Sequence, residues 1–181
     1  MSTKSMVFAI VGLALVFLGA NSMFIVNEME RAVLLEFGKV VRADVQPGLH
    51  FKWPFINRVR KFDGRVLTLD ASAERFLTLE KKAVIVDSYA KFRVDDVQKF
   101  YTATSGDELR AQNLLKERIN TGLRNEISNR SLHEVVSGER DELMTTLTRQ
   151  LDGVARNELG VAVVDVRVKR IDLPGQRGHK L

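Results

Sequence analysis

The chain of 181 residues contains no cysteine, only three histidines and a single tryptophan. Without cysteine, disulfides and thiolate metal sites are excluded. The histidines, His50, His133 and His179, lie in unrelated contexts, and none has an H-x-x-x-H or H-E-x-x-H partner. The G-x-S-x-G elbow, the phosphate-binding loop and the G-x-G-x-x-G motif are also missing. We therefore expect no metal, no cofactor and no enzymatic activity; Ser88, the one conceivable nucleophile, is better explained as a half-buried strand residue.

A large excess of charge of one sign is also missing. Lysine and arginine number 28 and aspartate and glutamate 23, which gives a formal net charge of +5. The basic residues are scattered among acidic ones, as in 116–118 (KER), and this spacing is typical of a solvated surface rather than a nucleic-acid interface. Attraction to anionic lipid headgroups accounts equally well for a small basic excess.

No charged residue occurs between Met6 and Val26. As a helix, residues 7–26 would be about 30 Å long, which matches the hydrocarbon core of a bilayer. We predict a transmembrane anchor here, within a segment 1–27. A cleaved signal peptide, with an apolar region over 6–18 and Ala20 before the cut, and a buried core helix are the alternatives. The anchor residues are Val7, Phe8, Ile10, Leu13, Leu15, Phe17, Leu18, Phe24, Ile25 and Val26. Lys4 on the short N-terminal side favours an N-terminus in the cytoplasm.

Strands are predicted for the first half of the remaining chain and helices for the second. Alternation places Val33, Leu35 and Phe37 on one face of a strand over 32–37, and 42–48 is a polar loop. Asp63-Gly64 is either a hairpin turn between strands 59–62 and 66–69 or a bulge within one strand. The remaining predicted elements are a strand over 83–94, helices over 96–101 and 107–130, a helix capped by Ser137 that ends before Gly160, and a strand over 161–171. The two long helices each have an apolar stripe, at Leu115, Ile119, Leu123 and Ile127 in the first and at Leu143, Leu147, Leu151, Val154 and Leu159 in the second.

Strands followed by helices and a closing strand predict an α+β domain over residues 28–174. In the last strand we expect Ala162, Val164, Val166 and Val168 to face the core. Ser105 and Glu108 have the spacing of a capping box at the start of helix 107–130. Residues 175–181 are polar and without periodicity, as expected of a disordered tail.

An aromatic segment follows the anchor at a distance of about 25 residues. Phe51, Trp53 and Phe55 alternate, Pro54 keeps the segment out of the middle of a sheet, and Ile56 extends the apolar stretch. Tryptophan is enriched at membrane interfaces because it combines an apolar ring with one polar N–H. A loop that dips into the headgroup region and a loop that packs into the domain core are both open at this point.

The segment 47–56 (PGLHFKWPFI) resembles the P-G-L-H-F-x-x-P-F signature of the SPFH, or band 7, family of stomatins, prohibitins and flotillins. Residues 63–89 and 164–174 narrow the resemblance to a bacterial group of that family. The resemblance implies a non-enzymatic scaffold in the bacterial inner membrane, with the domain in the periplasm. It also implies two partners, HflK in a hetero-oligomeric assembly and the membrane ATP-dependent protease FtsH, whose activity the assembly modulates.

The family continues past the Leu-Pro pair at 173–174 into a long charged helix, whereas this chain ends after seven more residues. We therefore expect a C-terminally shortened form that folds but assembles poorly. The alternatives to the scaffold are a lipid-organising membrane protein without a protease partner and, less in keeping with the missing motifs, a hydrolase.

Overall fold

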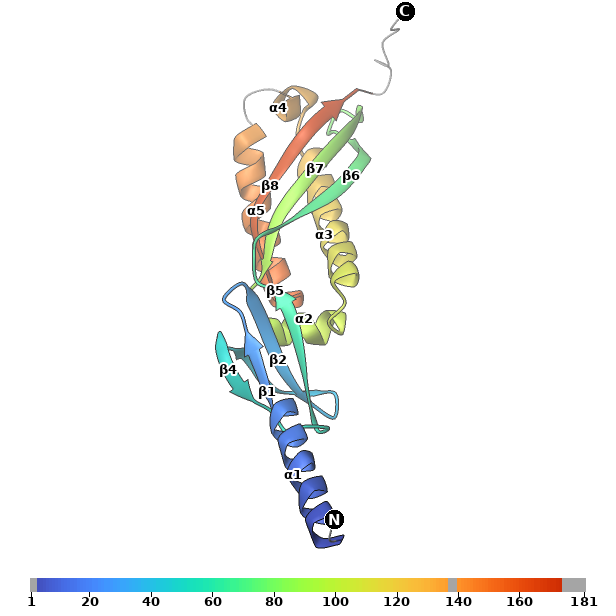
Figure 1. Ribbon diagram of the computed structural model, residues 1–181. Coiled ribbons are helices and arrows are strands. Elements are labelled where there is room, and N and C mark those ends of the chain that lie inside the picture. Colours follow the sequence, from blue (N-terminus) through green and yellow to red (C-terminus); the bar gives the residue numbers. More distant parts are fainter. Residues whose placement is uncertain (1–2, 137–139, 174–181) are drawn as a thin grey trace, which may run out of the picture. The chain divides into compact units, whose positions relative to one another are not determined.

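Both helices and strands contribute to the structure, a computed structural model that describes residues 3–136 and 140–173 (Figure 1). The predicted α+β class is confirmed. The chain divides into two compact units, Met1–Asp63 and Gly64–Leu181. The boundaries predicted at 27/28 and 174/175 stay predictions, and the predicted tail 175–181 and the cap Ser137 lie outside the described residues.

The first unit is a helix followed by two small antiparallel sheets. Its elements are α1 (Thr3–Asn21), β1 (Met23–Val26), β2 (Glu30–Glu36), β3 (Lys39–Val45), β4 (Gly48–Phe51) and β5 (Asn57–Asp63). Strands β1 and β4 form a two-stranded ribbon, and the other sheet has the order β3-β2-β5. Val26 of the ribbon packs with Ala32 and Val45 of the three-stranded sheet, and all three side chains are buried. The ribbon therefore covers one face of that sheet.

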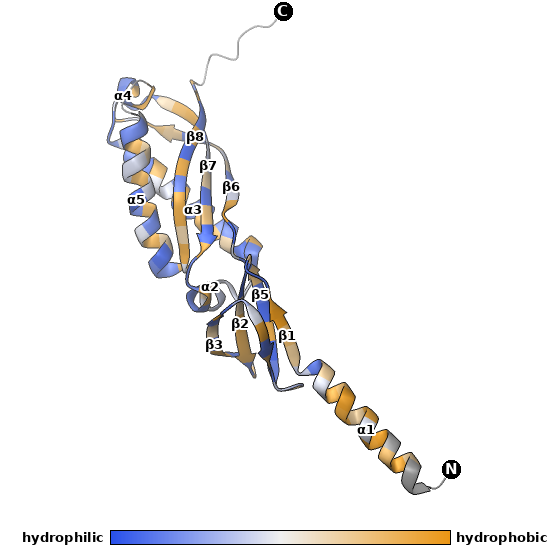
Figure 2. Cartoon of the chain, turned by 60° about the vertical axis from the view of Figure 1, so that its left-hand side comes forward, coloured by the Kyte–Doolittle hydropathy of each residue, from blue (hydrophilic) through white to orange (hydrophobic). Residues whose placement is uncertain are grey.

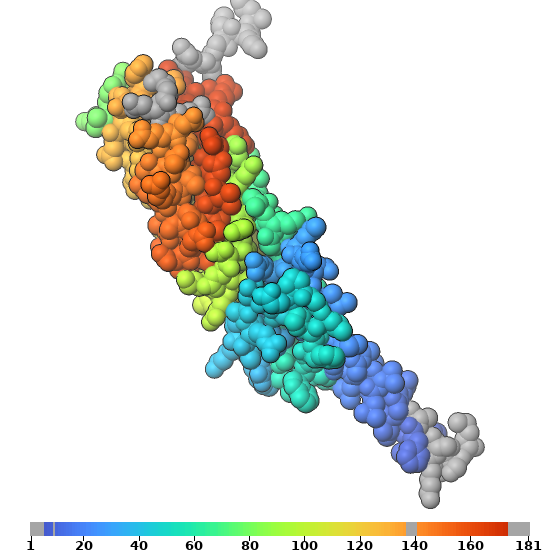
Figure 3. Space-filling model, turned by 90° about the vertical axis from the view of Figure 1, so that its left-hand side faces the viewer, coloured from blue at the N-terminus to red at the C-terminus, as the bar shows by residue number. Residues whose placement is uncertain are grey.

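The second unit is a three-stranded antiparallel sheet with helices on one face (Figure 1). Its elements are β6 (Leu67–Leu77), β7 (Ala83–Val94), α2 (Val97–Thr104), α3 (Glu108–Ser128), α4 (Leu132–Val136), α5 (Arg140–Glu158) and β8 (Val161–Asp172). The strand order is β6-β7-β8. Helix α5 lies against β8, as the orange and red atoms of Figure 3 show.

Alternation and helical periodicity together fill the core of the second unit. The residues of β7 that face the helices are all buried: Val84, Val86, Ser88, Ala90, Phe92 and Val94. The stripe predicted for α3 is buried as well, at Leu115, Ile119, Leu123 and Ile127. Of the stripe predicted for α5, Leu143, Leu147, Leu151 and Leu159 are buried, whereas Val154 has 39% of its surface exposed. Burial of this apolar area is the main term that stabilises the unit.

The last strand departs from the predicted alternation. The register changes between the pairs Lys91–Asp165 and Phe92–Val163, so that Val164 is the extra residue of a β-bulge. A bulge breaks the simple alternation, so that residues on its two sides no longer follow one pattern of faces. Val163 is consequently buried, and Val164, predicted to face the core, has 51% of its surface exposed.

Three further predictions about local structure are wrong. Strands β5 and β6 belong to different sheets, so Asp63-Gly64 is neither a hairpin turn nor a bulge. The predicted polar loop contains most of strand β3, which is held by pairing with β2. Helix α3 is capped by Asp107, whose carboxylate accepts from the backbone N–H groups of residues 109 and 110 at 2.9 and 3.3 Å. Ser105 instead ends α2 in a left-handed conformation.

The predicted transmembrane helix over 7–26 is also wrong in its extent. Helix α1 ends at Asn21, and Phe24, Ile25 and Val26 belong to strand β1 because their backbone pairs with residues 48–50 of β4. Within 3–136 and 140–173, no helix combines the length and the apolar character needed to cross a membrane.

Candidate lipid-facing surface of the first unit

Helix α1 carries apolar side chains that the rest of the first unit does not cover. Hydrophobic residues run along its described length, as the orange ribbon in Figure 2 shows. Seven predicted anchor residues lie on it and are all exposed: Val7, Phe8, Ile10, Leu13, Leu15, Phe17 and Leu18. Contiguous exposed apolar surface of this extent marks an interaction with lipid or protein.

Two polar side chains at the end of α1 satisfy carbonyl groups of the helix itself. The Asn21 side-chain amide donates to the carbonyl oxygen of Phe17 at 2.9 Å, and the Ser22 hydroxyl donates to that of Leu18 at 2.7 Å. Carbonyls in the last turn of a helix have no partner within the helix ladder. These two bonds reduce the cost of placing the helix end in a medium without water.

The aromatic loop between β4 and β5 lies beside this helix end. The Lys52 backbone N–H donates to the Ser22 carbonyl at 2.7 Å. Leu18, Ser22 and residues 51–55 line a hollow of about 580 Å³. The end of α1 and the aromatic loop, about 30 residues apart in sequence, therefore form one surface. The sequence pattern did not indicate this contact.

The four aromatic-loop residues singled out from the sequence point away from the core. Trp53 is 72% exposed and Phe55 is 87% exposed, and Phe51 and Ile56 are exposed as well. Of the two alternatives that the sequence left open, packing into the core of the first unit is therefore wrong. The membrane-interface role of these residues stays a prediction.

The β1–β4 ribbon adds two apolar residues that were not singled out from the sequence, Met23 and Leu49. Residues directly opposite in an antiparallel pair share a face. Met23 pairs with Phe51 and Ile25 pairs with Leu49, and all four side chains are exposed. The other face of the ribbon is covered, and it holds the Phe24 and His50 rings with their centroids 5.6 Å apart.

Basic residues border the aromatic loop. Lys52 lies within it, and Arg58 and Arg60 follow on β5 and are exposed. None of these three makes an ion pair with a residue that the structure describes, whereas the neighbouring Lys61 ammonium lies 2.9 Å from the Glu30 carboxylate. The Lys61 hydrogen bond holds the pKa of Glu30 below its ordinary value. Lys52, Arg58 and Arg60 are therefore available to an external anion beside the loop.

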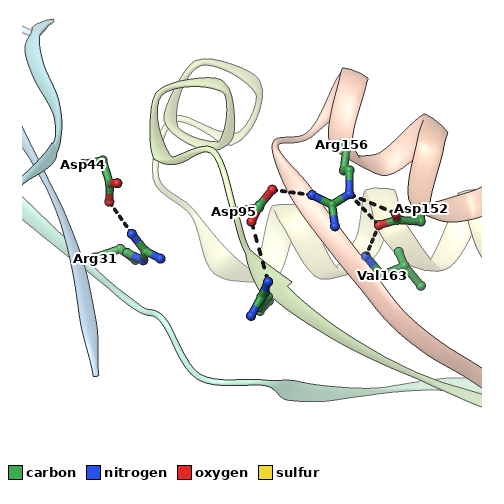
Figure 4. Close-up of polar contacts among 7 residues, drawn as sticks. Arg31, Asp44, Asp95, Asp152, Arg156 and Val163 are labelled. Carbon is green, nitrogen blue, oxygen red and sulfur yellow. Dashed lines mark hydrogen bonds and ion pairs between the residues drawn. The ribbon is translucent and has the colours of Figure 1, made fainter. Parts of the chain in front are cut away.

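The second unit holds polar contacts that serve its packing. Arg156 of α5 pairs with both Asp152 and Asp95, and Asp152 accepts a hydrogen bond from the Val163 N–H at 2.9 Å (Figure 4). That N–H lies where the β8 bulge interrupts regular pairing with β7. The Arg156–Asp152 pair thus fixes α5 on the irregular part of the strand.

The residues that were candidates for chemistry do not converge. His50 lies in β4 and His133 in α4, in different units, and His179 is outside the described residues. Ser88 is 1% exposed, and its hydroxyl has no hydrogen-bond partner among the residues described. Over the same residues, no group of three His, Asp or Glu side chains is arranged to hold a metal ion.

A model of the SPFH domain / Band 7 family matches residues 24–177, so the chain belongs to that family. Protein HflC of Haemophilus influenzae is 46% identical over 167 residues, which cover 86% of this chain and 56% of that protein. Protein HflC of Buchnera aphidicola from Acyrthosiphon pisum is 42% identical, with the same coverage of both chains. The protein of Escherichia coli K12 named "Modulator of FtsH protease HflC" is 36% identical over 216 residues, which cover 94% of this chain and 64% of that protein.

The resemblance inferred from the segment 47–56 is therefore confirmed. The chain spans between 56% and 64% of the length of these curated relatives.

Proposed function

We propose that this protein is a membrane-attached SPFH scaffold without enzymatic activity of its own, which modulates the protease FtsH in assembly with HflK. The observation that carries the proposal is the family match over residues 24–177, together with a relative named as a modulator of FtsH protease. The catalytic motifs missing from the sequence and the burial of Ser88 support a non-enzymatic role.

Attachment to the membrane is carried by the apolar surface of the first unit. Helix α1, the outer face of the ribbon and the aromatic loop expose hydrophobic side chains next to one another. In lipid, these side chains would leave water without any loss of core packing. The bacterial inner membrane is the proposed location, and the orientation inferred from Lys4 stays a prediction.

Co-purification tests the proposed partners. The tagged chain is expressed with HflK and FtsH, extracted in a mild detergent and isolated, and its partners and size are measured. We expect both partners to co-purify with the native chain in small amounts, in keeping with the poor assembly expected from the sequence. A Gly153→Ala variant should retain as much of both, since nothing lies within 4 Å of a methyl group added there. A Gly160→Ala variant, whose methyl group would overlap α2, should retain less of both partners. Isolation of the folded chain without either partner contradicts the proposal.

Fluorescence of the sole tryptophan, Trp53, tests the attachment independently of the protease. The full chain is reconstituted into vesicles that contain lipids labelled with a nitroxide quencher. Because Trp53 is on the exposed loop beside the end of α1, we expect strong quenching. Unquenched Trp53 in vesicle-bound protein would show that the loop stays in water.

A lipid-organising protein without a protease partner is the second candidate. The exposed aromatic loop favours it, because this surface binds lipid whether or not FtsH is present. Quenched Trp53 together with a failure to co-purify FtsH would select this candidate over the scaffold.

A further inference from the structure

The turn between β2 and β3 carries an aromatic side chain that neither the turn nor the core requires. Strands β2 and β3 are joined by two residues, Phe37 and Gly38, whose φ angles are +49° and +83°. Positive φ at both central residues defines a type I′ hairpin turn, which favours Asn-Gly or Asp-Gly. A bulky residue in this conformation is uncommon. Phe37 was predicted to share one face of a strand with Val33 and Leu35; those two are buried, but Phe37 lies in the turn and is 84% exposed.

This turn and the aromatic loop lie at the same end of the three-stranded sheet. Glu36 is paired on one side with Lys39 and on the other with Asn57, so these three residues form the last row of the order β3-β2-β5. The aromatic loop enters β5 at Asn57. The row is two strand spacings wide, about 10 Å. Figure 1 shows the turn after β2 next to the loop before β5, at the α1 end of the first unit.

The aromatic loop shows the same unusual combination. Phe55 has a φ of +72° and is 87% exposed. Two neighbouring loops thus hold a phenylalanine at a position where glycine or asparagine would be less strained. Strained residues persist where they serve a function, because folding alone selects against them.

We propose that Phe37 is a second aromatic residue that inserts into the bilayer, beside the Trp53 loop. The first unit then contacts lipid at α1 and at two loops, which lie at one end of the three-stranded sheet. The aromatic loop beside Phe37 is continuous with the exposed apolar surface of α1, which identifies the occupant as lipid. Lys39 and Arg58 are exposed next to the two loops, which suits anionic headgroups. The inference rests on the proposed attachment of the first unit to lipid.

Site-specific labelling tests the inference without background, because the chain has no cysteine of its own. A Phe37→Cys variant of the full chain carries an environment-sensitive fluorophore, in vesicles of phosphatidylethanolamine and phosphatidylglycerol with nitroxide-labelled lipid. The matched control is Gln46→Cys, an exposed position that follows β3 at the opposite end of the three-stranded sheet. We expect quenching at position 37 comparable to that of Trp53, and little at position 46.

The two labels separate this inference from the proposed function. Quenching of Trp53 without quenching at position 37 overturns the inference and leaves the attachment of the aromatic loop intact. Absence of quenching at both sites overturns both. Equal quenching at positions 37 and 46 also overturns the inference, because both ends of the three-stranded sheet would then lie equally close to lipid.

A Phe37→Asn variant tests whether the side chain serves folding instead. Asparagine tolerates positive φ, so this variant should unfold at the same temperature as the native chain or a higher one. In vesicles, Trp53 of the variant should be quenched less than in the native chain, because one of two neighbouring contacts with lipid is lost. A lower unfolding temperature, or unchanged Trp53 quenching, overturns the inference.

Discussion

Replacement of Gly160 by alanine should severely destabilise the second unit. Gly160 lies between α5 and β8 with a φ of +66°, and its carbonyl oxygen accepts from the backbone N–H groups of Asp95 and Asp96 at 3.0 and 2.9 Å. An added Cβ would lie 2.3 Å from the Asp96 carbonyl oxygen and 2.8 Å from the Phe100 nitrogen. Both atoms belong to the backbone at the start of α2, so they cannot move aside as a flexible side chain would.

The magnitude follows from two contributions. An L-residue in the left-handed conformation costs about 1–2 kcal/mol. Relief of the overlap requires α2 to shift, which weakens the two hydrogen bonds to Gly160 by about 0.5–1.5 kcal/mol each. The sum is about 2–5 kcal/mol. For a chain of this size, each kcal/mol corresponds to roughly 2–4 °C in Tm.

Thermal unfolding of the full chain in detergent, followed by circular dichroism, measures this loss. The control is Gly153→Ala in α5, where an added methyl group has no neighbour within 4 Å. Alanine is favoured over glycine inside a helix by about 0.8–1.0 kcal/mol, so the control should be slightly more stable than the native chain. A Gly160→Ala variant with native stability would refute the close approach of α2 to residue 160.

Three further outcomes are expected in the same assay. Val163→Thr should cost about 1–3 kcal/mol because it buries a hydroxyl, whereas Val164→Thr should change little; the reverse result would restore the simple alternation of β8. Leu147→Ala, at a fully buried position of α5, should cost about 2–5 kcal/mol, and a smaller loss would mean that the helix is not packed on the sheet as described. The Ser131 backbone N–H holds the pKa of Glu134 below its ordinary 4.5. The ionised carboxylate therefore stabilises the fold above pH 4.5, and this contribution is lost as the pH falls through the folded-state pKa. Glu134→Gln should weaken this acid dependence, and an unchanged pH profile would contradict it.

The sequence predicted best the elements whose periodicity is long and unbroken. Strand β7 spans Ala83–Val94 as predicted, and the stripe of α3 from Leu115 to Ile127 is buried as predicted. In each case one face is apolar over at least three repeats of the period, so that a shifted register would expose the whole face. Gly160 likewise follows α5 in the left-handed conformation expected of a residue after a helix end.

Predictions failed where pairing between distant segments decided the structure. Residues 23–26 continue an apolar run, yet they form a strand because β4, more than 20 residues later, offers a partner. Strand β3, part of which was predicted as a polar loop, is held in the same way by β2. Val164 is exposed because of a bulge that no local pattern announces, and Phe37 lies at a turn whose Phe-Gly sequence does not match the usual preference. The aromatic loop was recognised from its composition, but its contact with the end of α1 was not.

The absence of a linker after α1 has a mechanical consequence. A single residue, Ser22, separates the last residue of the helix from the first of β1, and its carbonyl accepts the Lys52 backbone N–H at 2.7 Å. Two chain segments therefore hold the end of the helix, and there is no flexible linker between the helix and β1. A tilt of α1 is therefore transmitted directly to the ribbon and the aromatic loop.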